Sequence, residues 1–415
     1  MASLPRLSAR LEAVALALIL LAALAVRLAA AQVMPMNLAD ADQASYYQMA
    51  QAALGPAPMR DIWGNVAFYS PGYPFVLAPF FAVFGATPIV VLSVNLLLGA
   101  VAILLLHALA RRLAGGGVAL LAALFFALLA QMVVACVGVT RENLSVPLLL
   151  CFALAVVALP DTRRPGVVGG LAGLAYGAGV LAGGSVLLTA LAVPVALWRR
   201  HNRASAAGAL AAFMLGAALV IGPWLWHTAD LLGRPVLTTN APFNLYVGNN
   251  PKATGHFVSM RDSPLGGQWR VMHRAMGELA ATDMLGSMAR DHIAANPGQT
   301  ALLSAKKLAL FWLPNTPEPG DGHGAAMTLL RWGAAAQQML LLLLAGLGCA
   351  GWRRFGHGMQ LVLAIAMLFW AVHAAAYVMP RYCLPAMPFV CLLAAGAALP
   401  LARRVAPFPA KMVPA

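Results

Sequence analysis

Two aspartates, Asp40 and Asp42, open the first polar segment of the chain, and Tyr46 follows four residues after Asp42. No glycine or proline interrupts the sequence from Asp40 to Leu54, so a helix would place Asp42 and Tyr46 on one face. A carboxylate there can act as a general base toward a hydroxyl or an amine. Asp40 also suits a helix cap, since an aspartate at a helix start accepts from free N–H groups. The Asp-x-Asp spacing would further suit a divalent cation at Asp40 and Asp42, although two carboxylates are weak evidence for one.

Other polar motifs lie at the ends of apolar runs. Arg141-Glu142 follows one such run, where Arg141 can contact an anion while Glu142 orients it. The alternative is a snorkelling pair between two helices. Prolines and glycines predict turns at Tyr69-Ser-Pro-Gly-Tyr-Pro74 and at Asn244 to Gly255. A last motif, Arg381-Tyr382, starts the final apolar run.

Composition indicates how these residues are positioned. The chain has 415 residues, of which 61% are hydrophobic and 10% charged, against about 25% charged in soluble domains. Leu/Ala runs that do not alternate predict helices in lipid and not a barrel. The net charge of +14 comes from arginine doublets at the ends of apolar runs, which indicates membrane topology and argues against nucleic-acid binding. No strand-associated GxGxxG or P-loop supports nucleotide use.

The fold class we predict is an all-α polytopic membrane bundle of about ten transmembrane helices. The predicted spans are 11–31, 89–110, 117–135, 144–159, 166–182, 184–198, 205–226, 333–351, 358–378 and 383–402. With a cytoplasmic N-terminus, 14 of the 27 basic residues fall inside with only two acids, as the positive-inside rule requires. The inner basic residues are Arg6, Arg10, Arg111, Arg112, Arg163, Arg164, Arg199, Arg200, Arg203, Arg353, Arg354, Arg403, Arg404 and Lys411.

Three stretches need a choice. Residues 166–198 contain Gly183-Gly184 and are expected to form two short spans, because one span would move Arg199 outside. Residues 71–86 are apolar but proline-rich, which favours a re-entrant or interfacial segment. The first span resembles a signal peptide, but Arg27 interrupts the cleavage region, so we expect it to remain uncleaved.

We expect a single membrane-embedded domain over residues 1–415, with two long extracytoplasmic loops at 32–88 and 227–332 and C-terminal transmembrane helices over 333–415. Function that needs loops should therefore lie outside. The spans contain almost no ionisable residues, which disfavours an ion-coupled transporter. His107 and His373 are expected to be structural and not haem ligands. The five cysteines are interpreted as apolar fillers, with a Cys136–Cys383 disulfide as the minor alternative.

The order of the motifs resembles the GT-C superfamily of membrane glycosyltransferases, in particular the ArnT-like and protein O-mannosyltransferase-like branch of glycosyltransferase family 39 type. The resemblance covers nearly the whole chain. It rests on Asp42, Tyr46 and Ala50, Ser70-Pro-Gly-Tyr-Pro74, Glu142, Pro223-Trp224, Asn244-Leu245, Gly248-Asn249-Asn250-Pro251, Gly255, Arg381-Tyr382, Pro385 and Pro388.

The resemblance implies transfer of a sugar from a polyprenyl-phosphate donor to an extracytoplasmic glycan, lipid or protein, with inversion. It implies a bacterial inner (plasma) membrane protein whose active site faces the periplasm. Asp42 would be the catalytic base with Asp40 as helper, and no metal is assigned. The phosphate contacts implied are Arg381 first, then Arg141, Arg27 and Arg60. The other substrate contacts implied are Tyr382, Glu142, Tyr46, Tyr69, Asn249 and Asn250.

The sequence also departs from the family pattern. Gly183-Gly184 stands where relatives often have Arg-Pro, and His227-Thr228 stands where they often have Arg-Asn. These departures leave the sugar and the acceptor open. The alternatives are a transporter or flippase of a lipid-linked saccharide and a catalytically inactive relative, such as an assembly subunit.

Overall fold

Long apolar runs become helices in this protein, because a backbone in lipid must satisfy its own hydrogen bonds. The computed structural model describes residues 8–200, 202–317, 324–351 and 355–405. Within them, β-type pairing is limited to one isolated bridge between His256 and Val378. The predicted all-α fold class is confirmed.

Seven helical segments in the described part are long and apolar enough to cross a bilayer. They are α1 (Ala9–Val33), α4 (Pro88–Ala114), α8 (Pro165–Ala182), α10 (Arg203–Leu232), α14 (Ala325–Cys349), α15 with η3 (His357–Ala371 and Val372–Ala374), and η4 with α16 (Pro380–Ala386 and Met387–Val405). An eighth results if α5 (Gly116–Ala127) and α6 (Ala130–Val137), bent by 52°, cross as one span. The chain is therefore a multi-pass membrane protein.

Two of the ten predicted spans are shorter than a full crossing. They correspond to α7 (Glu142–Ala158) and to η1 with α9 (Gly184–Leu191 and Ala192–Trp198). Gly183 separates α8 from η1, as the prediction of two helices in residues 166–198 requires. The proline-rich segment forms α3 (Gly72–Phe84), whose 13 residues rise about 20 Å against about 30 Å of hydrocarbon. Helix α3 is thus too short to cross, as predicted.

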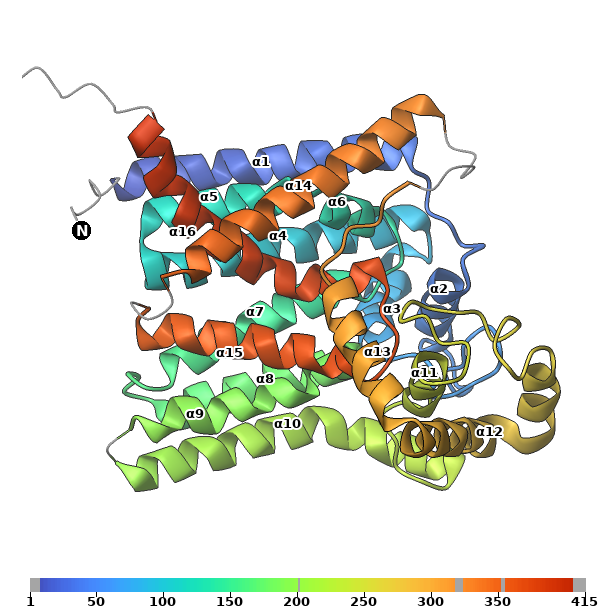
Figure 1. Cartoon of the computed structure of the whole chain (residues 1–415). Coiled ribbons are helices and arrows are strands. Elements are labelled where there is room, and N and C mark those ends of the chain that lie inside the picture. The colour runs from blue at the N-terminus through green and yellow to red at the C-terminus, as the bar shows by residue number, and fades with distance from the viewer. Residues whose placement is uncertain (1–7, 201, 318–323, 352–354, 406–415) are drawn as a thin grey trace, which may run out of the picture.

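The bundle has two different ends (Figure 1). The long helices run side by side, and one end, here called the loop end, is covered by α2 (Ala41–Ala52), α11 (Asn240–Gly248), α12 (Gln268–Ala295) and α13 (Pro297–Leu310). The connections α4–α5, α7–α8, α9–α10 and α14–α15 lie at the opposite end. Arginine doublets of the described residues, Arg111-Arg112, Arg163-Arg164 and Arg199-Arg200, accompany the first three of these connections, while Arg6, Arg353, Arg354 and Lys411 lie outside the described residues.

Small residues bring two helices of the bundle into close contact. Gly169 and Gly173 of α8 approach α10 so closely that an added Cβ would overlap the carbonyl oxygens of Ala209 and Phe213. Such small-residue packing is how helices associate in lipid, where apolar burial provides little driving force. The five cysteines are all unpaired, which agrees with their interpretation as fillers.

Three elements far apart in sequence begin at the loop end and carry the polar motifs. Asp42 is the second residue of α2, Glu142 is the first residue of α7, and Arg381 is the second residue of η4. Helix starts project their first side chains beyond the bundle, so these three residues can meet there.

Candidate active site

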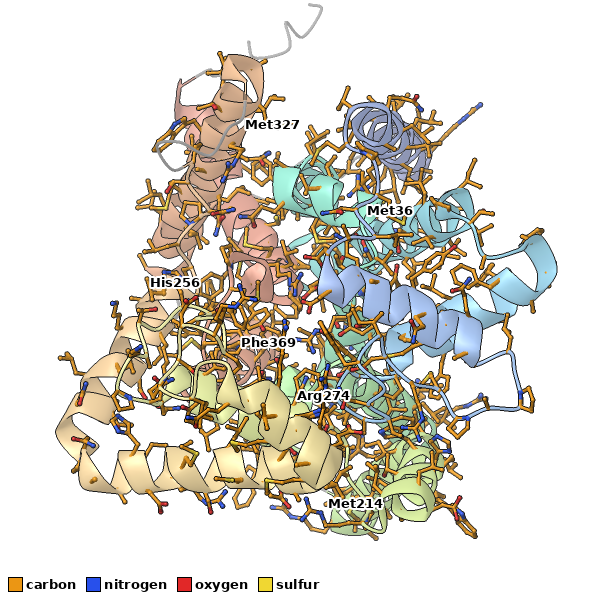
Figure 2. All side chains as sticks on the ribbon, turned by 90° about the vertical axis from the view of Figure 1, so that its right-hand side faces the viewer. Met36, Met214, His256, Arg274, Met327 and Phe369 are labelled. Atoms are coloured by element: carbon orange, nitrogen blue, oxygen red, sulfur yellow. The ribbon has the colours of Figure 1, made fainter. Side chains whose placement is uncertain are left out.

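A cavity of about 1300 Å³ opens at the loop end. Its walls come from the starts of α2 and α7, from the segment before α3, from α11, from the loop leading into α12 and the start of α12 itself, and from η4. Figure 2 looks onto this end, with Arg274 near the middle of the face. The charged residues that line the cavity are Asp42, Glu142, Asp262, Arg141, Arg261, Arg270, Arg274 and Arg381.

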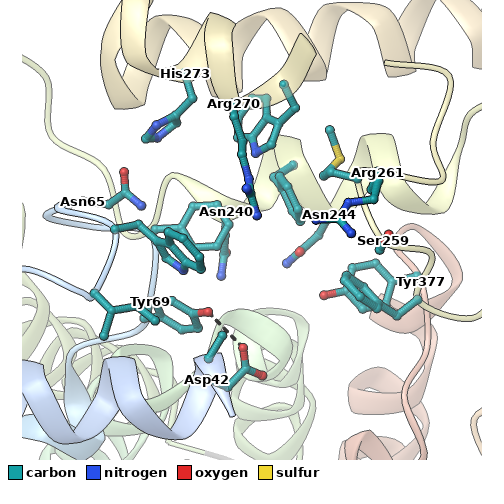
Figure 3. Close-up of a pocket in the computed structure, with 18 of the residues that line it drawn as sticks. Asp42, Asn65, Tyr69, Asn240, Asn244, Ser259, Arg261, Arg270, His273 and Tyr377 are labelled. Carbon is teal, nitrogen blue, oxygen red and sulfur yellow. Dashed lines mark hydrogen bonds between the residues drawn. The ribbon is translucent and has the colours of Figure 1, made fainter. Parts of the chain in front are cut away.

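Asp42 is the aspartate of the pair that faces the cavity (Figure 3). Its Oδ1 accepts a hydrogen bond of 2.9 Å from the Tyr69 hydroxyl. Its Oδ2 pairs with Nη2 of Arg381. Burial and the adjacent Asp42 carboxylate raise the pKa of Tyr69, so this hydroxyl stays protonated and remains a donor. Asp42 is thus held by two partners and still has 35% of its side chain exposed.

Arg381 links the two carboxylates at this site. Its Nε lies 3.8 Å from Oε1 of Glu142, and Glu142 is nearly inaccessible, with a side-chain exposure of 5%. Arg141 Nε lies 3.7 Å from the same Glu142 oxygen. Burial disfavours the charged form of Arg141, but Tyr46 and Glu142 outweigh that effect and raise its pKa. The paired cluster, defined as Asp42, Glu142, Arg141 and Arg381, therefore balances two negative and two positive charges.

One donor in the paired cluster is left over. Arg381 Nε is buried and has no hydrogen-bond partner among the described residues. A buried unsatisfied donor is costly, and such a group in a native structure calls for an explanation such as a catalytic role or a bound ion or water. The Arg141 guanidinium also lies over the Tyr382 ring, 5.9 Å from its centre. The cluster can thus accept an anionic group beside a carboxylate base.

The structure brings seven of the sequence-predicted residues together around the cavity, namely Asp42, Tyr46, Tyr69, Arg141, Glu142, Arg381 and Tyr382. Asp40 instead caps α2, where its Oδ1 accepts from the Gln43 N–H at 3.0 Å. This is the structural alternative that the sequence left open.

Two predicted phosphate contacts lie elsewhere. Arg27 is buried in the bundle, where it donates to the carbonyl oxygens of Ala23 and Ala127 at 3.1 and 2.8 Å. Arg60 is exposed and donates to the Gly64 carbonyl oxygen at 2.6 Å. Neither lines the cavity. Their positions in the sequence did not show that Arg141 lines the cavity while Arg27 and Arg60 do not.

Asn249 and Asn250 have structural roles. Asn249 Nδ2 donates to the Leu245 and Ala375 carbonyl oxygens at 2.9 and 2.6 Å, and Asn250 Nδ2 donates to Tyr246 at 2.9 Å. Because Ala375 lies shortly before η4, Asn249 fixes α11 to the segment that presents Arg381. These two predicted substrate contacts therefore hold the backbone around the site through hydrogen bonds, and neither lines the cavity.

Lys307 of α13 completes this support. Its side chain is fully buried, and Nζ donates to Asn249 Oδ1 at 3.0 Å. No carboxylate in the described residues lies within ion-pair distance of it. Burial lowers the pKa of Lys307 to about 8, from an ordinary value of 10.5.

This lysine predicts a pH dependence of stability. Between pH 8 and 10.5 the unfolded chain binds more protons than the folded one, so the free energy of unfolding should rise with pH in that window. The Lys307→Met variant lacks the titrating amine, so its free energy of unfolding should not show this rise with pH. Thermal unfolding in detergent should therefore show a wild-type midpoint that rises relative to the variant's between pH 7.5 and 10. A difference between the two proteins that does not change with pH contradicts this prediction.

Glu278 joins the two loops that form the cavity walls. Its carboxylate accepts from the Val66 and Ala67 N–H groups at 2.7 and 3.0 Å and from the Thr239 hydroxyl at 2.6 Å. Phe68 and Tyr69 follow directly and line the cavity. Glu278 thus fixes the position of the tyrosine that holds Asp42.

Glu278→Ala should lower the free energy of unfolding by about 1–3 kcal/mol, because three buried donors lose their acceptor. The matched comparison is Arg234→Gln, which removes an exposed ion pair with Asp283 worth less than about 1 kcal/mol. Thermal unfolding of both variants in detergent measures the contrast. Equal losses in the two variants would show that Glu278 is not the link between the loops.

Several cavity residues were not identified as candidates from the sequence, namely Arg261, Arg270, Arg274, His273, Asn240 and Tyr377. The expected phosphate contacts were arginines of the first loop and of the ends of the spans, whereas Arg261, Arg270 and Arg274 lie within the second loop. A usable signal was the spacing of Arg270 and Arg274, since residues four apart share one helix face.

A divalent cation at Asp40 and Asp42 requires oxygens that converge. Asp40 turns back to its own helix, and Asp42 is held by Arg381 and Tyr69. No group of three or more His, Cys, Asp or Glu side chains suited to a metal occurs among the described residues. These residues do not fit the oxygen-rich shell that hard cations prefer.

Known proteins similar to this chain agree on one fold. The family model of dolichyl-phosphate-mannose-protein mannosyltransferases matches residues 69–227. The Archaeoglobus fulgidus oligosaccharyltransferase in the apo form superposes with a TM-score of 0.57 at 13% identity, covering 96% of this chain and 51% of that one. The archaeal oligosaccharyltransferase AglB from Archaeoglobus fulgidus, in complex with an inhibitory peptide and a dolichol-phosphate, gives 0.55 at 14% identity, covering 97% and 52%.

ArnT from Cupriavidus metallidurans bound to undecaprenyl phosphate gives a TM-score of 0.42 at 14% identity, covering 96% of this chain and 80% of that one. A search of curated protein sequences found no match. The chain spans about half the length of the archaeal oligosaccharyltransferases it matches. The chain thus shares the fold of the archaeal oligosaccharyltransferases, and its residues 69–227 resemble the dolichyl-phosphate-mannose-protein mannosyltransferase family.

Proposed function

We propose that this protein transfers a sugar from a polyprenyl-phosphate-linked donor to an acceptor in the cavity at the loop end. The observation that carries the proposal is the paired cluster, in which Arg381 pairs with Asp42 and both Arg381 and Arg141 lie beside Glu142, in a cavity of a GT-C fold. The name of the matched family and the dolichol-phosphate bound to the archaeal AglB support a lipid-linked donor.

The reaction needs a base and a site for the leaving phosphate. Asp42 takes the proton from the acceptor hydroxyl or amine as that group bonds to the anomeric carbon. The bond from the anomeric carbon to the phosphate oxygen breaks, and its electron pair stays on the polyprenyl phosphate. Attack opposite the leaving group inverts the anomeric configuration. Arg381 and Arg141 stabilise the phosphate as it gains charge.

The resting structure suggests how the donor prepares the base. Arg381 pairs with Asp42, and its Nε has no hydrogen-bond partner. A donor phosphate that binds Arg381 competes with Asp42 for the guanidinium and frees the carboxylate to accept a proton. Tyr69 keeps Asp42 in position through this change, because its hydroxyl stays protonated.

The proposal also places the site relative to the membrane. The arginine doublets lie at the end opposite the cavity, and in a bacterial inner membrane such residues face the cytoplasm. The cavity then faces the periplasm, where a donor held in the membrane meets an acceptor from outside.

Mass spectrometry of envelope glycans and glycolipids from a deletion strain of the source organism tests the proposed function. The expected result is the loss of one sugar modification, which returns with the wild-type gene and not with the Asp42→Asn gene. An unchanged set of glycans and glycolipids in the deletion strain would oppose the proposal.

A further inference from the structure

The wall of the cavity opposite Asp42 carries three arginines that the proposed mechanism does not use. Arg261 lies in the loop before α12, and Arg270 and Arg274 lie in the first turns of α12. Figure 3 shows Arg261 and Arg270 directed into the cavity across from Asp42. We call Arg261, Arg270 and Arg274 the arginine wall.

The arginine wall differs from the paired cluster in having no internal partners. In the described residues, none of its three guanidiniums forms an ion pair or a side-chain hydrogen bond, whereas Arg141 and Arg381 each face a carboxylate. The nearby Asp262 accepts a hydrogen bond of 2.7 Å from Ser259. Five arginines and three carboxylates line the cavity, so its surplus of positive charge lies in this wall.

The donor does not account for that surplus. A sugar linked to polyprenyl phosphate is a phosphodiester with one negative charge, and the paired cluster offers it the guanidinium of Arg381, whose Nε has no hydrogen-bond partner. Three further guanidiniums across the cavity suit a second anion, because arginine binds phosphate and carboxylate through bidentate, charge-assisted hydrogen bonds.

The neighbours of the arginine wall suit a saccharide. Trp63, Trp269 and Phe257 all line the cavity, and Trp63 has 57% of its surface exposed. Exposed aromatic rings in a cavity mark ligand sites. The side-chain amides of Asn240 and Asn244 provide donors and acceptors for hydroxyl groups.

We propose that the arginine wall binds the acceptor, and that this acceptor is a glycan or glycolipid with a phosphate or carboxylate near the hydroxyl or amine that receives the sugar. The identification of the bound anion as the acceptor rests on the proposed function. The anion-binding wall itself rests on the three unpaired guanidiniums. Selectivity follows because a neutral glycan leaves them without a partner.

A binding experiment without donor tests the anion site. The full chain in phosphatidylcholine nanodiscs is titrated with glucose 6-phosphate, glucuronate and glucose, and tryptophan fluorescence reports binding. Both anionic sugars should bind at least about tenfold more tightly than glucose, and the Arg261→Gln/Arg270→Gln/Arg274→Gln variant should lose that preference. The matched control is Lys252→Gln/Arg290→Gln/Lys306→Gln, which removes three exposed charges of the same loop that do not line the cavity. It should bind as the wild type does.

Three results would overturn the inference. Anionic sugars could bind the wild type no better than glucose, or the control variant could lose binding as far as the arginine-wall variant. A pentaglutamate peptide that binds more tightly than both anionic sugars would instead indicate a polypeptide acceptor.

A second titration separates this inference from the proposed function. Undecaprenyl phosphate should bind the wild type and the arginine-wall variant equally, since it contacts the paired cluster. If undecaprenyl phosphate fails to bind while the anionic sugars bind through the arginine wall, the proposed donor is wrong and the anion site stands. In nanodiscs containing phosphatidylglycerol, glucose 6-phosphate should still bind, which distinguishes a saccharide site from one filled by lipid headgroups. Loss of binding there would overturn the saccharide assignment.

Discussion

Replacing Asp42 with asparagine should lower sugar transfer by about 10²–10⁴-fold, the usual contribution of a general base. Asparagine can still accept the hydrogen bond from Tyr69, so the fold and the position of the side chain should persist. Donor binding should not weaken, because Arg381 loses a competitor for its guanidinium. The loss should therefore appear in kcat and not in the donor KM.

Asp40→Asn is the matched control, since asparagine caps a helix as well as aspartate does. Its transfer rate should stay within about twofold of the wild type, because Asp40 accepts from Gln43 and does not line the cavity. Initial rates of both variants with purified protein, together with their thermal unfolding, measure the contrast. Transfer by Asp42→Asn at the wild-type rate would remove Asp42 from the mechanism.

Arg381→Gln should lower kcat/KM for the donor by about 10²–10³-fold, as expected when one charge-stabilising group is removed. The variant loses the guanidinium that contacts Asp42 and Glu142 and that would hold the leaving phosphate. Arg381→Lys should recover only part of the activity, because an ammonium cannot reproduce the planar contacts of a guanidinium to two carboxylates.

Arg60→Gln provides the comparison for Arg381. Arg60 is exposed and outside the cavity, although the family resemblance ranked it among the phosphate contacts. Its kcat/KM should change less than about twofold, in line with surface substitutions generally. A loss at Arg60 equal to that at Arg381 would show that the phosphate lies outside the paired cluster.

The sequence was most informative where lipid limits the choices. Apolar runs had to be helices, and Gly183 correctly marked the break between α8 and η1. The predicted spans 144–159 and 184–198 match α7 and η1 with α9, which are apolar but shorter than the other spans. Hydropathy alone does not report where a helix begins at a polar residue such as Glu142.

The site depended on contacts that sequence spacing cannot give. Asp42 and Arg381 are 339 residues apart in the chain, and only the fold brings the starts of α2 and η4 together at the loop end. The same holds for Glu278 and Val66, which are 212 residues apart. Arg27 shows the converse case, since it stands beside a loop in sequence but is fixed inside the bundle by the Ala127 carbonyl.

The choice between Asp40 and Asp42 shows what local pattern does settle. Both aspartates suit a helix start, and the sequence correctly named capping as the alternative for Asp40. Helical spacing also placed Asp42 on one face with Tyr46, and both line the cavity. The arginine wall was not predicted, because only the fold of the second loop brings its three arginines to the cavity that Asp42 lines.

The most direct test of the central claim is the release of polyprenyl phosphate from polyprenyl-phosphate-linked sugars by the purified protein in liposomes. The liposomes contain an envelope extract as the source of acceptor, and the donor is labelled in the sugar. We expect the wild type to move label into the extract with release of an equal amount of polyprenyl phosphate, and Asp42→Asn to do neither. Movement of intact donor across the bilayer without release of polyprenyl phosphate would contradict the account and indicate a transporter.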